Sequence, residues 1–238
     1  QDIIFNALHG GIGENGKVQS WMSKNGIKYT GSGPKASALC MDKAMSKKLV
    51  QDNEINTPDW QLLYNRNDKI IIDFPFVVKP NQQGSTVGLS IVNDETEISE
   101  AIEKGFQYGK HVIIEKYIIG KELTIPIIGD ETYPIIQIKP SHGLYDYECK
   151  YTPGMSEYIC PAILKKEEVE KIHHDTKLIF KEFGCFGYGR ADYILDNNGV
   201  HYFLEMNTLP GMTSTSLVPK SAISKGTSFN KLIEIIID

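Results

Sequence analysis

The chain has 238 residues, 41% of them hydrophobic and 23% charged, which is the composition of one or two globular domains with their own cores. Its net charge of −5 is not typical of a nucleic-acid-binding protein, because such proteins are usually basic. No apolar run reaches the ~18–20 residues that span a bilayer. The four cysteines are scattered and never form a C-x-x-C pair, which favours a reducing compartment over a zinc site. We therefore expect a cytoplasmic protein without nucleic-acid or membrane partners.

The first residues run directly into an apolar segment. The chain starts at Gln1 without a methionine, and Ile3–Leu8 has the pattern of a short buried strand. Natural N-termini seldom begin inside a core strand. We therefore expect that a further segment precedes Gln1.

The remaining elements follow from periodicity and from turn and cap residues. Up to the middle of the chain, the pattern predicts a glycine-rich loop over 9–16, helix 17–25, strand 27–30, a helix from 34, helix 43–52 capped by Asp42, strands 61–63 and 76–79, a polar loop over 81–88, and strand 89–92. Beyond it, the pattern predicts helix 95–106, strands 111–115, 123–129 and 133–139, a long polar loop over 140–154, helix 166–183, strands 188–195 and 200–205, and a helix from 229. Mixed elements with several hairpins favour an α+β fold over a doubly wound sheet.

The strongest chemical signal lies in the predicted hairpin near the C-terminus. Arg190 and Asp192 stand two apart on one strand, and Glu205 and Asn207 stand two apart on the next. Residues two apart share a face of a strand, so Asp192, Glu205 and Asn207 can offer oxygen ligands of the type that Mg²⁺ takes beside phosphates. Arg190 on that face could stabilise a phosphoryl transition state. A solvated salt bridge on a surface hairpin is the alternative.

A glycine loop and two lysines indicate phosphate binding. Asn81–Gly88 is rich in glycine and small hydroxyl residues, whose backbone N–H groups can approach phosphate oxygens. It lacks the lysine–serine ending of a P-loop, so a flap over ATP phosphates fits better. Lys43 and Lys79 are candidate phosphate partners. A plain turn and solvated lysines are the alternatives.

Two other polar segments fit a nucleotide and a carboxylate. Glu115–Ile118 leaves an apolar strand and could present backbone groups to an adenine edge, with Glu122 near ribose hydroxyls. Asn207–Leu217 is a run of small polar residues whose donors could bind a carboxylate. The alternatives are a salt bridge at a strand end and a glycine–proline turn with a helix cap.

Together these segments resemble the D-alanine–D-alanine ligase family of the ATP-grasp superfamily. The matching stretches, in the family's order, are His9-Gly-Gly, Tyr29-Thr-Gly-Ser-Gly33, Met41-Asp-Lys43, Val78-Lys-Pro80, Gly84-Ser-Thr-Val-Gly88, Ile114-Glu-Lys116, Tyr145–Tyr151, Gly187-Tyr-Gly-Arg-Ala-Asp192 and Leu204–Thr213. The resemblance implies an ATP-grasp fold with a partial N-terminal α/β domain. Its expected parts are a remnant of that domain over 1–31, a central lobe over 32–115, and a C-terminal lobe with the magnesium and substrate site over 116–238.

The resemblance also implies the reaction. It is the ATP-dependent ligation of two D-alanines to D-alanyl-D-alanine through a D-alanyl phosphate, for peptidoglycan synthesis. A carboxylate is a poor electrophile because oxide would have to leave, and phosphorylation supplies a better leaving group. The expected cofactors are ATP and two Mg²⁺ ions, with Mn²⁺ as a substitute, and the expected assembly is a homodimer.

The resemblance assigns roles to individual residues. It implies that the Mg²⁺ ligands are Asp192, Glu205 and Asn207. It implies that ATP is contacted by Lys43, Lys79, Glu115, Lys116, Ile118, Glu122 and Lys150. The groups it implies for the acyl phosphate and tetrahedral intermediate are Arg190, the Gly211 backbone N–H, Ser85 on the flap and Tyr151 on a closing loop. It implies that the first D-alanine is oriented by His9 and Glu14, and the second by Ser216 and the Leu217 amide.

Other functions remain open at this point. D-alanine–D-lactate ligases usually carry a histidine in the loop of Tyr151, so that tyrosine favours an amine nucleophile. A D-alanine–D-lactate ligase or another ATP-grasp carboxylate ligase is nevertheless an alternative. A truncated nucleotide-binding remnant without catalysis is a third, because the family's glutamate for the first D-alanine's ammonium group precedes Ile3 and has no counterpart here.

Overall fold

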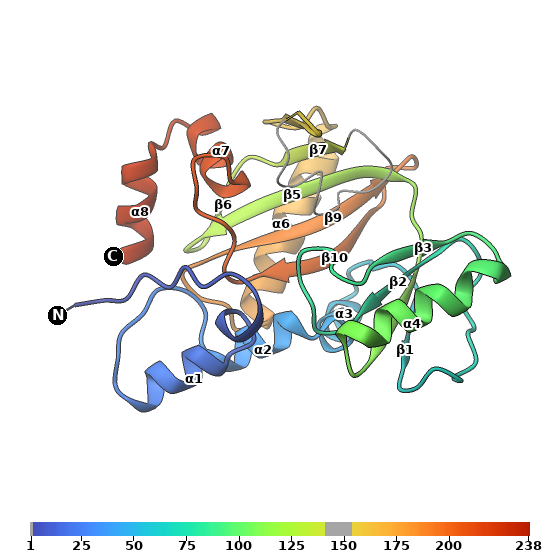
Figure 1. Ribbon diagram of the computed structural model, residues 1–238. Coiled ribbons are helices and arrows are strands. Elements are labelled where there is room, and N and C mark those ends of the chain that lie inside the picture. The colour runs from blue at the N-terminus through green and yellow to red at the C-terminus, as the bar shows by residue number, and fades with distance from the viewer. Residues whose placement is uncertain (1, 141–153) are drawn as a thin grey trace.

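The computed structural model describes residues 2–140 and 154–238, and its strands form two antiparallel sheets (Figure 1). The smaller sheet has the order β1-β4-β2-β3 and consists of β1 (Trp60–Leu63), β2 (Phe76–Pro80), β3 (Ser90–Val92) and β4 (Val112–Lys116). The larger has the order β10-β9-β5-β7-β8, with β6 beside β5. Its strands are β5 (Gly120–Ile128), β6 (Glu131–Thr132), β7 (Ile136–Pro140), β8 (Ser156–Ile159), β9 (Tyr188–Asp196) and β10 (His201–Asn207). The predicted α+β class is confirmed.

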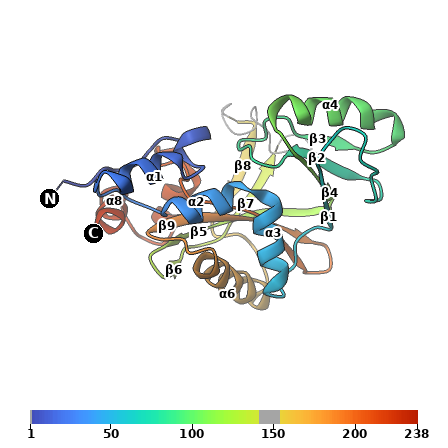
Figure 2. The same cartoon turned by 90° about the horizontal axis from the view of Figure 1, so that it is seen from below.

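One face of the smaller sheet is covered by a helix. The short 3-10 helix η2 (Glu95–Glu97) leads into α4 (Ile98–Tyr108), which lies across β2 and β3 (Figure 2). Alternation along β2 sends Phe76 and Val78 into the apolar core beneath α4. Val77 and Lys79 are therefore left on the opposite face, toward the larger sheet.

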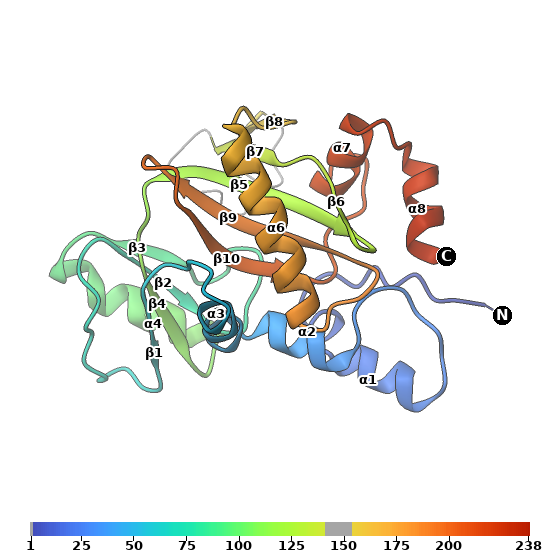
Figure 3. The same ribbon diagram turned by 180° about the vertical axis from the view of Figure 1, so that it is seen from behind.

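Helices also cover one face of the larger sheet. The long helix α6 (Lys166–Glu182) crosses the strands (Figure 3), and α2 (Pro34–Met41) and α3 (Lys43–Asp52) contribute to the same core. In β9, Ala191, Tyr193 and Leu195 are buried in that core. Arg190, Asp192 and Ile194 consequently face the other way. No helix in the described ranges is both long and apolar enough to cross a membrane.

The predicted cap of α3 is confirmed. The Asp42 side chain accepts a hydrogen bond of 3.1 Å from the Met45 backbone N–H, a free donor of the first helical turn. This cap fixes where the helix starts, and Lys43 is its first residue.

The prediction of a buried strand over residues 3–8 is wrong. Among the described residues this segment makes one parallel bridge, between Ile4 and Tyr29, and 27–30 likewise forms no longer strand. Ile4 is 46% exposed and Leu8 56%. The apolar pattern is present, but no sheet in the described ranges flanks it, so Ile4 and Leu8 stay exposed.

The two ends of the described chain lie near each other (Figure 1). The first part carries the 3-10 helix η1 (Gly11–Gly13) and α1 (Lys17–Lys24), and the last part carries α7 (Leu217–Ser224) and α8 (Phe229–Ile237). Leu209, Val218 and Leu232 pack with Tyr188 in a separate small core. This core places the segment after β10 beside the N-terminal loop.

Candidate active site

The β9–β10 hairpin holds four polar side chains on one face. Asp192 pairs in register with Glu205, and Arg190 with Asn207. The predicted arrangement of these four residues on adjacent antiparallel strands is therefore confirmed. Their face is the one opposite α6, and it looks toward the smaller sheet.

A β-bulge interrupts β10 beside this group. The pairing shifts between Phe203 and Glu205, so Leu204 is an extra residue without a partner on β9. Phe203 is buried in the core under α6, whereas both Leu204 and Glu205 line the cleft. A bulge places two successive residues against one on the neighbouring strand, and here it adds an apolar side chain next to the carboxylate.

Asp192 is held by three donors. Arg190 binds it in a bidentate ion pair, with Nε 2.9 Å from Oδ1 and a terminal guanidinium nitrogen 2.8 Å from Oδ2. The Thr124 hydroxyl on β5 also donates to Oδ1, at 2.5 Å. Bidentate pairing fixes both position and angle, so the orientation of this carboxylate is set before any ligand binds. Thr124 was not predicted as a site residue.

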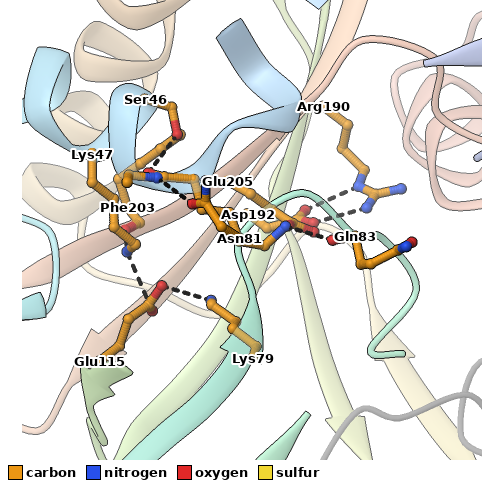
Figure 4. A network of polar contacts seen from close by, with 12 residues as sticks. Ser46, Lys47, Lys79, Asn81, Gln83, Glu115, Arg190, Asp192, Phe203 and Glu205 are labelled. Carbon is orange, nitrogen blue, oxygen red and sulfur yellow. Dashed lines mark hydrogen bonds and ion pairs between the residues drawn. The ribbon is translucent and has the colours of Figure 1, made fainter. Parts of the chain in front are cut away.

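Lys43 joins the flap to the hairpin, and its partners Gln83 and Glu205 are labelled in Figure 4. Its Nζ lies 3.1 Å from Glu205 Oε2 and donates to the Gln83 carbonyl oxygen at 2.7 Å. The cap at Asp42 fixes the start of α3, and the Asn81 side chain accepts from the Ala44 N–H at 2.9 Å. Lys43 is therefore oriented by its helix and by the base of the flap together.

The flap itself has an unusual backbone. Between β2 and β3, Ser85 and Thr86 have φ angles of 53° and 64°, in the left-handed region that non-glycine residues rarely occupy. Asn81 at its base also donates to Asp42 at 2.9 Å, and Gln82 donates to the other Asp42 oxygen at 2.8 Å. The flap thus has an anchored base, with its strained residues at the edge of the cleft.

A buried carboxylate on the smaller sheet is paired with two lysines (Figure 4). The Glu115 carboxylate on β4 forms ion pairs with Lys79 Nζ at 2.8 Å and with Lys47 Nζ at 3.2 Å. Burial raises the pKa of Glu115, but the charges of the two lysines outweigh this and hold it below its usual value. Burial lowers the pKa of Lys47 to about 8, even though Glu115 opposes that change. Lys47 was not among the predicted site residues.

Most of the predicted site residues line one cleft between the two sheets. They are Lys43, Lys79, Ser85, Glu115, Lys116, Ile118, Glu122, Arg190, Asp192 and Glu205. Its apolar walls include Val77, Ile138, Ile194 and Leu204. The predicted residues Lys150 and Tyr151 lie outside the described part of the chain. The cleft combines apolar walls with strongly charged side chains, as a nucleotide requires.

A second polar group connects the N-terminal loop to the hairpin. His9 Nδ1 lies 3.1 Å from Glu14 Oε1 and 3.2 Å from the Leu209 carbonyl oxygen. The hydrogen bond to Glu14 raises the pKa of His9. In the orientation that satisfies both of its amide atoms, Asn207 donates to Glu14 at 3.3 Å and accepts from Arg190 at 3.0 Å. The structure therefore brings His9 and Glu14 next to the predicted metal ligands.

The remaining predicted residues meet where α7 begins. Ser216 Oγ accepts from the Thr213 N–H at 3.0 Å, and Leu217 is the first residue of the helix. A side chain on Gly211 would place its Cβ 2.8 Å from Ser216 Oγ. A side chain at position 211 would therefore force the Ser216 hydroxyl to shift.

The donor set on the hairpin fits a magnesium ion that is shared with a substrate. The described residues contain no group of three or more His, Cys, Asp or Glu side chains able to hold a metal. Asp192, Glu205 and Asn207 supply two carboxylates and an amide oxygen, and Mg²⁺ usually completes such a partial set with water and substrate phosphates. Arg190 and Lys43 meanwhile neutralise the two carboxylates.

Comparison with known proteins identifies this architecture. The model for the C-terminal part of D-Ala–D-Ala ligases matches residues 49–238. A D-alanine–D-alanine ligase of Syntrophotalea carbinolica is 42% identical over 99% of this chain and 78% of its own length. The D-alanine–D-alanine ligase structure from Bacillus anthracis complexed with ATP has a TM-score of 0.86 at 36% identity and covers 99% of this chain and 78% of the other. The VanG D-Ala:D-Ser ligase structure from Enterococcus faecalis has a TM-score of 0.89 at 31% identity, covering 99% and 72%.

The two sheets and the charged cleft between them define an ATP-grasp enzyme, and the structural neighbours have this fold. Within that class, the family match and the identities above place the chain in the D-alanine–D-alanine ligase family, to which it belongs. The predicted family and fold are thus confirmed, whereas the roles of individual residues stay predictions.

Proposed function

We propose that this protein joins two D-alanines to D-alanyl-D-alanine at the expense of ATP, as a step toward peptidoglycan. The chain belongs to the D-alanine–D-alanine ligase family, and one structural observation supports the proposal within that family. The hairpin carboxylates Asp192 and Glu205 lie in one cleft with Lys43, Lys79 and Arg190. Transfer of a phosphoryl group between two anions requires such cationic side chains to offset the negative charge, together with carboxylates that can hold a metal ion.

ATP would occupy the cleft between the sheets. Its apolar walls suit adenine, and the polypeptide around Lys116 and Ile118 offers backbone groups to the base edge. Glu122 lines the same cleft and would take the ribose hydroxyls. The flap, Lys43 and Lys79 would take the phosphates.

The reaction then proceeds in two transfers. A carboxylate oxygen of the first D-alanine attacks the γ-phosphorus of ATP, and the bond to ADP breaks. The amine of the second D-alanine attacks the resulting acyl phosphate carbon and loses a proton, and inorganic phosphate leaves as the tetrahedral intermediate collapses. Arg190 would stabilise the negative charge that develops in both steps. Mg²⁺, held by Asp192, Glu205 and Asn207, would supply electrostatic neutralisation of the phosphates.

The substrates would be oriented from the two ends of the described chain. Glu14 contacts His9 and Asn207, and Asn207 contacts Arg190, which supports a role for His9 and Glu14 in orienting the first D-alanine. Ser216 and the Leu217 amide at the start of α7 would hold the carboxylate of the second. The homodimer, the count of two ions, the use of Mn²⁺ and the domain limits remain predictions.

The test is a reconstituted reaction. Purified protein with MgATP and D-alanine should release phosphate and form the dipeptide, measured by phosphate assay and mass spectrometry. D-serine and D-lactate as second substrates discriminate the related ligase activities, because the D-Ala:D-Ser ligase named above shares the fold. D-alanyl-D-alanine should be the preferred product. ATP binding without any ligation would instead support the non-catalytic alternative.

A substitution tests the site. Asp192→Asn removes a negative charge from the proposed metal set, so we expect a loss of ligation of about 100-fold or more, in the range of removing one preorganised electrostatic group. Asp130→Asn, in the exposed turn between β5 and β6, is the control. Near-normal phosphate release by Asp192→Asn would overturn the site.

A further inference from the structure

Glu115 is a buried carboxylate with two cationic partners. Its side chain is 3% exposed, and it lies 2.8 Å from Lys79 Nζ and 3.2 Å from Lys47 Nζ. A buried charge is tolerated only while an opposite charge pairs with it, and removing the last partner is strongly destabilising. One lysine would be enough to pair with Glu115, and the structure supplies two.

The two lysines differ in their access to the cleft. The Lys79 side chain is 13% exposed and lines the cleft. The Lys47 side chain is 0% exposed and is held away from the cleft on α3. Figure 4 shows the two side chains reaching Glu115 from different sides. Only Lys79 can therefore change its partner when a ligand enters.

Lys47 is fixed in place by its other contacts. Its Nζ donates to Thr57 Oγ1 at 2.8 Å and lies 3.5 Å from the Phe203 carbonyl oxygen. Thr57 in turn donates to the same carbonyl at 2.8 Å. An ammonium group has three donors, and Glu115, Thr57 and Phe203 account for them. These contacts join α3, the smaller sheet and the strand that carries Glu205.

We propose that Lys47 is a positioning residue for ATP binding: it remains on Glu115 as a resident counter-ion and thereby frees Lys79 to leave Glu115 for the phosphates. The inference rests on the proposed function, because that function puts the phosphates of ATP at Lys79.

The charges support this exchange. With both lysines in place, the cluster carries one positive charge in excess. When Lys79 turns to a phosphate, Glu115 and Lys47 remain as a neutral pair. Burial lowers the pKa of Lys47, and the nearby charges of Lys79 and Lys43 lower it further while Glu115 raises it. Withdrawal of Lys79 therefore removes a repulsion from Lys47, and no buried charge is left unpaired.

The experiment compares ATP affinity in a cycle of variants. Lys47→Met removes the charge and keeps an unbranched side chain, so ATP must compete with Glu115 for Lys79. We expect the Kd for ATP to rise about tenfold, which is within the coupling found for residues of one ionic network. Lys48→Met, on the exposed side of the same helix, should leave the Kd unchanged. In a Glu115→Gln background, Lys47→Met should have no effect, because no buried carboxylate then competes.

The outcomes separate the inference from the proposed function. An equal rise in Kd in both backgrounds, or no rise in either, overturns the role of Lys47. Failure of the unsubstituted protein to bind ATP overturns the proposed function, and the inference falls with it. If Lys47→Met does not fold, Thr57→Val and Thr57→Ser replace it. The valine, which cannot anchor Lys47, should weaken ATP binding several-fold relative to the serine, and equal affinities overturn the proposal.

Discussion

Thr124 gives the most discriminating test of how the hairpin works. It is fully buried on β5 and donates to Asp192 Oδ1 at 2.5 Å. Thr124→Val replaces this hydroxyl by a methyl group and leaves the carboxylate with Arg190 alone. A hydrogen bond to a charged group contributes about 1.5–3 kcal/mol. Because each 1.36 kcal/mol is tenfold in rate, the variant should lose about 10- to 100-fold in turnover.

The assay measures phosphate release at saturating D-alanine while Mg²⁺ is varied. The valine variant should need more Mg²⁺ for half-maximal rate, because partners that orient a metal ligand affect metal affinity. Thr124→Ser keeps the hydroxyl and loses a methyl group, so it controls for packing. Thermal unfolding of both variants accounts for any loss of folded protein. Equal rates and equal Mg²⁺ dependence in the two variants would refute the argument.

Three further predictions follow from packing and charge. Gly211→Ala puts a Cβ 2.8 Å from Ser216 Oγ, so the KM for D-alanine should rise about tenfold if Ser216 holds the second substrate; an unchanged KM would argue against that role. Phe203→Ala empties a fully buried site and should lower the free energy of unfolding by about 3–5 kcal/mol, measured with denaturant; a loss below about 1 kcal/mol would contradict the packing. Burial raises the pKa of Asp175, but the hydrogen bond from His201 at 2.7 Å helps to bring it below its usual 3.8. A carboxyl group whose pKa is lower in the folded state stabilises the fold at pH values above its unfolded-state pKa. This stabilisation is lost as the pH falls through the folded-state pKa. Asp175→Asn should therefore be less stable than the unsubstituted protein at neutral pH, with a difference that narrows in acid; a difference independent of pH would contradict it.

Local pattern was sufficient to predict the hairpin at the centre of the site. The Asp-Asn-Asn-Gly turn predicts the hairpin, and the spacing of two groups Arg190 with Asp192 and Glu205 with Asn207. The bulge at Leu204 is what brings the two groups opposite each other on one face. The helix cap at Asp42 was equally local. Such features depend on residues close in sequence, so they can be predicted from periodicity and from the residues that cap helices.

Contacts between distant segments were not predictable in this way. Thr124 and Asp192 are 68 positions apart, and Lys47 and Phe203 are 156 apart. A threonine within an apolar strand and a lysine within an amphipathic helix have ordinary patterns. Only the packing of β5 against β9, and of α3 against β10, gives these two side chains their partners. The residue Leu204 was missed for a related reason, because a bulge does not follow from composition.

The bulge at Leu204 separates the apolar lining of the cleft from the placement of the polar side chains on the same strand. If that residue were absent, Phe203 would still face the core, and Glu205 and Asn207 would still face the cleft, because the pairing on both sides of the bulge keeps its alternation. Leu204 is thus dispensable for the strand and for the carboxylate beside it. It contributes only an apolar surface to the cleft. Changes at this one position can therefore alter the apolar surface of the cleft without disturbing the residues proposed for phosphoryl transfer.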